Sequence, residues 1–270
     1  MKNFLTLVFL LTLPLILFAQ KEYTEEEITV ICDSIMEEAN ILYKYERAAW
    51  MGTDMTLEDR TLRYEFRRYI VYEENDSIFF IALNSDDLCI STYVFYDDFT
   101  FPTRFDEVRR KLNSTEKNIL KVRNKILEEI VDNEYEIEFY DDFTPNFILL
   151  PYINGYKMYM IMGTSKRNVI PFGNDYIFFA DEKGRIESYR QFHKTLISTE
   201  TEDDDGNKIA SMTHSHLEAE PFITATDICT FRLYADIYEL EAFSVYSTAL
   251  SLYFKYNYET NTISIEKKTE

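Results

Sequence analysis

Glycine and proline are both scarce in this sequence, which has only 6 of each among its 270 residues. Such a composition excludes collagen-like and low-complexity architectures. The sequence also lacks the motifs that hold a phosphate or a nucleophile on closely spaced glycines, since it contains no P-loop, no G-x-G-x-x-G and no G-x-S-x-G. Nucleotide-binding and serine-hydrolase functions of those types are therefore not expected.

Cysteine is equally rare. Cys32, Cys89 and Cys229 are an odd number, lie far apart and never form C-x-x-C, which excludes a disulfide framework and a thiolate zinc site. Cys32 falls on the apolar face of an expected helix and Cys89 falls inside a strand-like run. We expect buried thiols that act as small hydrophobic side chains, with a single disulfide as the open alternative.

Positive charge is in short supply, with 28 Lys and Arg against 48 Asp and Glu and a formal net charge of −20. No basic stripe interrupts this acidity, so we expect no nucleic-acid partner. The sequence does supply a core, because 46% of its residues are hydrophobic and it contains 21 Tyr and 21 Phe. That composition excludes a disordered chain, and the length suits one large domain or two small ones.

The first twenty residues have the pattern of a signal peptide. Lys2 precedes an apolar run over residues 4–18, and the small Ala19 comes before a polar stretch. We expect residues 1–20 to be removed and the protein to be exported to the periplasm or the extracellular space. An uncleaved anchor is the alternative, although the run is short for a membrane span and contains Pro14. No later stretch predicts a membrane span in the mature chain.

The pattern after residue 20 predicts an α+β fold. A capping box at Thr24 and Glu27 begins a long helix, which we expect to end at the WMGTD sequence of residues 50–54. Strands over residues 69–73, 78–83 and 88–96 form a meander, and a second helix begins near residue 113. A hairpin at Asn154-Gly155 opens a strand-rich remainder that includes a helix near residues 225–239. We expect two units, an N-terminal helix plus β-meander over residues 21–112 and an α/β domain over 113–270.

One short segment carries chemistry. His214 and His216 are separated by one residue, so in a strand both imidazoles point to the same side. Thr224 and Asp227 follow, and Asp227 falls in the first turn of the next helix. Two imidazoles and one carboxylate match an open zinc site, in which bound water attacks an amide carbonyl. The alternative is that Thr224 and Asp227 form only a capping box.

The spacing H-S-H-x7-T-x-x-D resembles the signature of the JAMM (JAB/MPN-type) zinc metallopeptidases. The resemblance implies a JAB/MPN-like mixed sheet flanked by helices over residues 113–270, with zinc held by His214, His216 and Asp227. Thr224 stands where the family has a serine that helps to hold the oxyanion. The implied activity is hydrolysis of an amide or isopeptide bond, and export suggests a peptide or cell-wall-derived substrate.

The general base of that family is not found at its usual place, because no Glu occurs between Glu138 and Glu182. The candidates that lie close in sequence are Glu187, Glu218 and Glu220. Three further segments, WMGTD at 50–54, FGNDY at 172–176 and ITATDICT at 223–230, are similar to uncharacterised exported proteins of Bacteroidota-type bacteria. That similarity implies export but no activity.

Two alternatives to an enzyme stay open. One is a non-catalytic exported binding or interaction protein with a structural or degenerate metal site, and the other is a scaffold without metal. The third histidine of the chain, His193, lies on an expected strand. A structural role for His193 is favoured over a role as an extra ligand or as a hydrogen-bond partner of a ligand.

Overall fold

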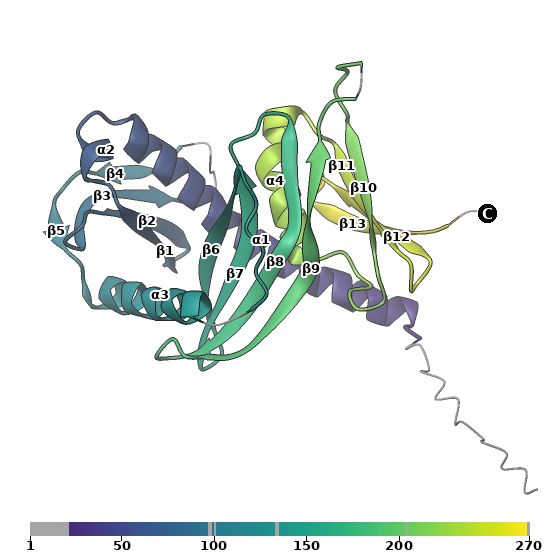
Figure 1. Ribbon diagram of the computed structural model, residues 1–270, viewed down its shortest axis with the longest axis horizontal. Coiled ribbons are helices and arrows are strands. Elements are labelled where there is room, and N and C mark those ends of the chain that lie inside the picture. Colours follow the sequence, from purple (N-terminus) through teal and green to yellow (C-terminus); the bar gives the residue numbers. More distant parts are fainter. Residues whose placement is uncertain (1–21, 97–98, 100, 133–134, 204, 269–270) are drawn as a thin grey trace, which may run out of the picture.

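The computed structural model describes residues 22–96, 99, 101–132, 135–203 and 205–268 (Figure 1). The expected signal peptide and the Asp97-Asp98 pair lie outside these residues. The described chain is a mixture of helices and mainly antiparallel sheets, as the sequence predicts at this coarse level. None of the described helices combines the length and the apolar character that are needed to cross a membrane.

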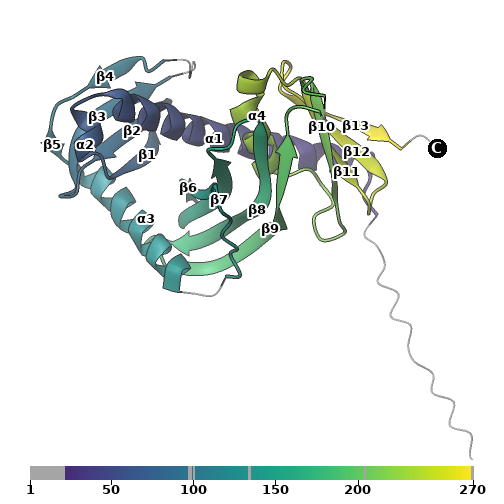
Figure 2. The same ribbon diagram turned by 45° about the horizontal axis from the view of Figure 1, so that its top comes forward.

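Helix α1 (Glu25–Glu58) runs along most of the molecule (Figures 1 and 2). Its predicted capping box is present, with the Thr24 hydroxyl accepting from the backbone N–H of Glu27. The predicted break at residues 50–54 is wrong, because the helix continues through Gly52. A Cβ at position 52 would overlap the ring of Phe80, so this glycine allows α1 to lie close against the N-terminal sheet.

The N-terminal sheet confirms the predicted meander. Its first three strands pair antiparallel in sequence order, and two short strands extend the pairing of the third. Helix α2 (Leu62–Glu65) precedes the sheet, and helix α3 (Ser114–Asp132) follows it. The strands are β1 (Arg68–Glu74), β2 (Ser77–Leu83), β3 (Leu88–Phe95), β4 (Arg104–Asp106) and β5 (Arg110–Lys111).

The central sheet is a four-stranded antiparallel meander in the middle of the molecule (Figure 2). The predicted hairpin is present, with Asn154 in the left-handed region at φ 59°. Side chains alternate along the second strand: Met158 and Met160 face the core shared with α3, while Tyr159 and Ile161 face the core shared with α1. The strands are β6 (Phe143–Tyr152), β7 (Gly155–Thr164), β8 (Val169–Asp181) and β9 (Ile186–Glu200).

The C-terminal sheet has the order β10-β11-β12-β13, with one parallel pair between β10 and β11. Helix α4 (Ala225–Tyr238) connects that pair and packs on α1. The strands after residue 113 thus lie in two separate sheets, and a single mixed sheet of the JAB/MPN kind is not confirmed. The strands are β10 (Ser211–His216), β11 (Ala242–Ser247), β12 (Leu252–Asn257) and β13 (Thr262–Lys267).

The three cysteines are buried and free. Cys32 and Cys229 belong to the core shared by α1 and α4, and Cys89 belongs to the core beside α3. The prediction of buried thiols that pack as small hydrophobic side chains is confirmed.

Candidate metal centre

Two strands from different sheets and one helix bring together four side chains of the types that bind metal ions. His193 comes from β9, His214 and His216 come from β10, and Asp227 comes from the first turn of α4. One ligand atom of each residue lies within 4.8 Å of the others. The cluster contains every histidine of the chain and could hold a metal ion.

Strand β10 positions two of the rings as the sequence predicts. His214 and His216 lie two residues apart on the strand, and their Nε2 atoms are 2.9 Å apart. The edges of aromatic rings support His214, since Phe172 and Phe243 lie at centroid distances of 5.6 Å and 5.0 Å. These buried rings restrict the position of the His214 imidazole.

His193 joins the cluster because of a β-bulge. Asp175 and Tyr176 are adjacent on β8, but their partners on β9, His193 and Gln191, are two residues apart. The extra residue reverses the alternation of side chains on β9. Gln191 donates to the hydroxyl of Tyr176 at 2.6 Å, whereas Nε2 of His193 lies 2.8 Å from Nε2 of His216. The sequence favoured a structural role for His193 and did not predict that its ring would lie in the cluster.

Asp227 belongs to both of the arrangements that the sequence left open. It is residue N3 of a capping box, in which the Thr224 hydroxyl accepts from the backbone N–H of Asp227 at 3.1 Å. Its Oδ2 atom accepts from the Thr224 backbone N–H at 2.9 Å and from the Thr224 hydroxyl at 2.7 Å. Its Oδ1 atom lies 3.4 Å from Nε2 of His214 and 3.7 Å from Nε2 of His193. The helix cap therefore orients the carboxylate toward the rings.

Hydrogen-bond acceptors behind two rings determine which nitrogen faces the cluster. Nδ1 of His193 lies 2.7 Å from a carboxylate oxygen of Asp175, and Nδ1 of His216 lies 2.6 Å from the carbonyl oxygen of Phe222. A carbonyl oxygen only accepts, so Nδ1 of His216 carries the proton, and the same tautomer suits His193 beside a carboxylate. The lone pairs of two neutral rings then face each other at 2.8 Å. A shared proton or a metal cation is needed between them.

The charges at the site favour a cation. Asp175 and Asp227 are 2% and 1% exposed and carry two negative charges when ionised. Burial lowers the pKa of His193, but Asp175 and Asp227 outweigh it and raise that pKa to about 10. Burial also raises the pKa of Asp227, but the three imidazoles hold it well below its usual range. A divalent cation would balance the two carboxylates with all three rings neutral.

Two further properties of the donor atoms fit a metal ion: a missing hydrogen-bond partner and the distances between the atoms. Oδ1 of Asp227, which faces the rings, is buried without a hydrogen-bond partner among the described residues. Ligands about 2.0–2.2 Å from a tetrahedral zinc ion lie about 3.3 Å from one another. The separations between neighbouring donor atoms here run from 2.8 to 3.7 Å. The residues present could therefore hold a metal ion through three nitrogen ligands and one oxygen ligand.

No glutamate belongs to the four-residue cluster. Of the predicted base candidates, Glu187 and Glu218 are exposed, and Glu220 forms a paired interaction with Arg190, with Oε1 2.7 Å from Nε. Thr224 is 4% exposed, and its hydroxyl group forms hydrogen bonds with Asp227 and Thr226. Among the described residues, the structure thus brings the predicted ligands together, and none of the three predicted base candidates belongs to the cluster.

Asp175 was not singled out from the sequence. It contacts His193 through Oδ1 and accepts from the Thr226 hydroxyl through Oδ2. Nothing in the FGNDY segment by itself indicates this role, because its partners lie 18 and 51 residues away.

A comparison of the chain with family models, curated proteins and solved structures gave no match.

Proposed function

We propose that this protein binds a divalent metal ion, zinc, through His193, His214, His216 and Asp227. The observation that carries the proposal is the convergence of imidazole Nε2 atoms and an unpartnered carboxylate oxygen on one buried, negatively charged point. Imidazole nitrogen and carboxylate oxygen are common ligands of zinc, which accepts four of them in a tetrahedral arrangement.

The role that best suits four protein ligands is a non-catalytic one. Structural zinc sites are closed by four protein ligands, whereas catalytic sites keep one position for water. His216 and Asp227 are almost inaccessible, at 2% and 1% exposure. The ligands come from the central sheet, the C-terminal sheet and α4, so a bound ion would hold these three elements together. We therefore favour a metal-stabilised binding or interaction protein.

Metal analysis tests this function. The purified protein, loaded with zinc and freed of excess metal, should hold one equivalent, and His214→Ala should hold less than a tenth of that. Ser215→Ala, which changes an exposed neighbour on the same strand, should keep the full equivalent. Substitution with Co²⁺ should give the visible absorption of a tetrahedral ion in the wild type and in Ser215→Ala only. Equal zinc in His214→Ala and wild type would exclude the site.

Zinc-dependent hydrolysis of an amide or isopeptide bond is the second candidate, as the JAMM-type spacing implies. A groove of about 490 Å³ passes Thr224 and Phe222, which both hydrogen-bond metal-ligand residues. His193 and His214 keep 10% and 9% of their side chains exposed. Zinc lowers the pKa of bound water to about 7 when a position is open. The groove has room for a peptide, and residues 1–20 would direct the protein to compartments that contain cell-wall peptides.

His193→Ala separates the two candidates. If His193 is an extra ligand of a hydrolase, this variant keeps zinc and cleaves peptides in a cell-wall digest, as followed by mass spectrometry. If four ligands form a structural site, the variant binds zinc at least tenfold more weakly and cleaves nothing. Hydrolysis by the wild type that is lost in His214→Ala would make the enzyme the better reading.

A further inference from the structure

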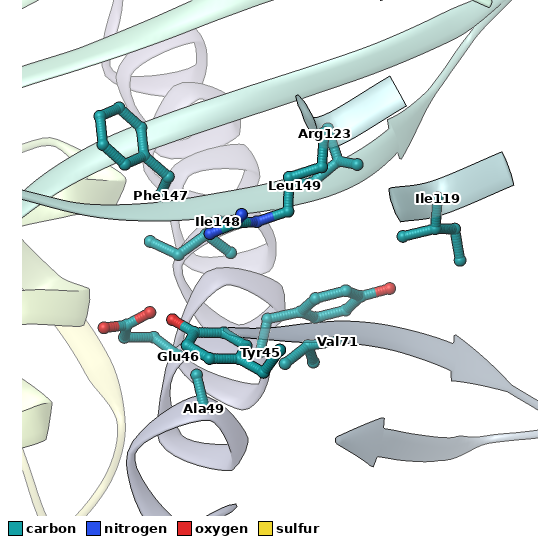
Figure 3. A pocket seen from close by; sticks show the side chains of 10 residues that line it. Tyr45, Glu46, Ala49, Val71, Ile119, Arg123, Phe147, Ile148 and Leu149 are labelled. Atoms are coloured by element: carbon teal, nitrogen blue, oxygen red, sulfur yellow. The ribbon is translucent and has the colours of Figure 1, made fainter. Parts of the chain in front are cut away.

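A second cavity lies far from the metal ligands, where α1, β1, α3 and β6 meet. An outer cleft of about 430 Å³ adjoins an inner cavity of about 20 Å³, and Figure 3 shows the residues that line the inner cavity. The inner cavity has room for about one water-sized group. The two spaces are adjacent, since four side chains line both of them: Tyr45, Val71, Ile119 and Leu149.

Glu46 of α1 lies at the inner end with half of its carboxyl group unused. Its side chain is 1% exposed, and its Oε1 atom accepts from the indole N–H of Trp50 at 2.9 Å. Its Oε2 atom is buried and makes no hydrogen bond of good geometry with the described residues, although the Asn146 side chain and the Arg123 charge both act on this carboxyl group and oppose the rise of its pKa. A buried oxygen without a hydrogen-bond partner is unfavourable, so a group that supplies a partner there gains free energy.

Arg123 of α3 reaches the same inner cavity from the other side. Figure 3 shows its side chain beside Ile148 and Leu149, above the level of Glu46. The guanidinium lies 5.7 Å from the ring centre of Tyr69 and forms no ion pair with any described residue. Arg110, by contrast, pairs with buried Glu116 at 2.6 Å. Arg123 is partly buried, and burial lowers its pKa while the charge of Glu46 acts to raise it, so an added anionic partner would favour the charged form of Arg123.

We propose that this cleft is a binding site for a small molecule that carries a carboxylate on an apolar body. One carboxylate oxygen fits the inner cavity between Arg123 and Glu46, and Arg123 supplies the charge. The apolar body lies along Val71, Ile119 and Leu149 in the outer cleft. Burial raises the pKa of Glu46 to about 8, so at neutral pH its carboxyl group holds a proton and can donate it in a hydrogen bond to the ligand.

The contrast between a carboxylate and its neutral amide decides this proposal. Trp50 is the only tryptophan of the chain and donates to Glu46, so its fluorescence reports directly on the site. Hexanoate, titrated at pH 7, should change the Trp50 emission saturably and raise the melting temperature. Hexanamide, which has the same apolar body without the charge, should bind at least tenfold more weakly.

Variants of α3 localise the binding. Arg123→Met should abolish the hexanoate response, whereas Lys121→Met, at an exposed position of the same helix, should keep it. Arg123→Lys keeps the charge but loses paired hydrogen bonding, so it should bind several-fold more weakly and serves if Arg123→Met does not fold. Equal responses to acid and amide, no response up to 20 mM hexanoate, or full binding by the Arg123 variants would each overturn the proposal. None of these readouts depends on zinc.

Discussion

The acceptor behind an imidazole ring decides what that ring can bind. Asp175 holds Nδ1 of His193 at 2.7 Å, and the Phe222 carbonyl holds Nδ1 of His216 at 2.6 Å. Both contacts leave Nε2 free for a metal ion and fix the ring direction. A carboxylate carries negative charge and a backbone carbonyl does not, so His193 has a charged acceptor behind its ring and His216 has a neutral one.

Asp175→Asn should weaken zinc binding by about 10- to 100-fold, since the change removes the charge behind His193 and keeps an oxygen acceptor. Asp181→Asn, on the same strand but paired with Arg185, serves as the control and should bind as the wild type does. Competition with a chromophoric chelator measures both affinities. Unchanged affinity in Asp175→Asn would mean that Asp175 does not support the metal centre.

Glu46 should make stability fall as the pH rises. Burial raises its pKa from 4.5 to about 8 against the opposing effect of the Trp50 hydrogen bond. Between these values the folded protein holds a proton that the unfolded chain has lost, so the contribution is full below pH 4.5 and is lost by about pH 8. The loss amounts to at most roughly 5 kcal/mol.

Glu46→Gln should remove that slope, because its amide does not titrate. Urea unfolding of both proteins at pH 5 and pH 8.5 gives the double difference, in which the titration of the histidines cancels. The variant should gain stability relative to the wild type at the higher pH, by a few kcal/mol. Parallel pH profiles would show that Glu46 does not titrate in this range.

Helices α1 and α4 both begin with a capping box, but the two boxes differ in burial. Thr24 and Glu27 cap α1 at an exposed end, and Thr224 and Asp227 cap α4 where both residues are buried. An N-cap contributes about 1 kcal/mol to stability. Of these two caps, only the second also orients a carboxylate of the proposed metal site.

These two caps form a matched pair for mutation. Thr24→Ala should lower the free energy of unfolding by about 1 kcal/mol and leave zinc affinity unchanged. Thr224→Ala should cost more, about 2 kcal/mol, and should weaken zinc binding, because Oδ2 of Asp227 loses its hydroxyl donor. Urea unfolding and zinc competition measure the two effects, and equal zinc affinity in both variants would separate the cap from the metal centre.

At the scale of elements, local patterns predict boundaries where local contacts decide them. The capping boxes, the Asn154-Gly155 turn and the three N-terminal strands follow from neighbours in sequence. The break expected near Gly52 fails, because a glycine that usually weakens a helix is placed here against Phe80. The bulge in β9 is equally invisible in the sequence, because it depends on pairing with β8.

Across the whole molecule, the proposed ion would join the central sheet to the C-terminal sheet, while none of its four proposed ligands comes from the N-terminal sheet. Zinc at about 100 times its dissociation constant stabilises the folded state by about 2.7 kcal/mol, so a chelator should lower the melting temperature by about 5–10 °C.

Hydrogen exchange shows which elements lose stability when the metal ion is removed. After chelation, amide protection should fall in β9, β10 and α4 and stay unchanged in β1, β2 and β3. The same treatment of His214→Ala should change nothing further. A uniform loss of protection in all three sheets, or no loss at all, would contradict a local cross-linking role.

The sequence alone determined the pair of rings on β10 and the carboxylate at the start of α4, because strand alternation and helix capping act over a few residues. It also predicted the three long helices, although not where α1 ends, as well as the N-terminal strands and the buried state of the cysteines. Only the tertiary structure decided that His193 completes the cluster, that Asp175 supports it and that Arg123 and Glu46 line the same inner cavity. Those contacts join residues 18 to 77 positions apart, and burial gives them their charge and hydrogen-bonding character, which no local pattern encodes.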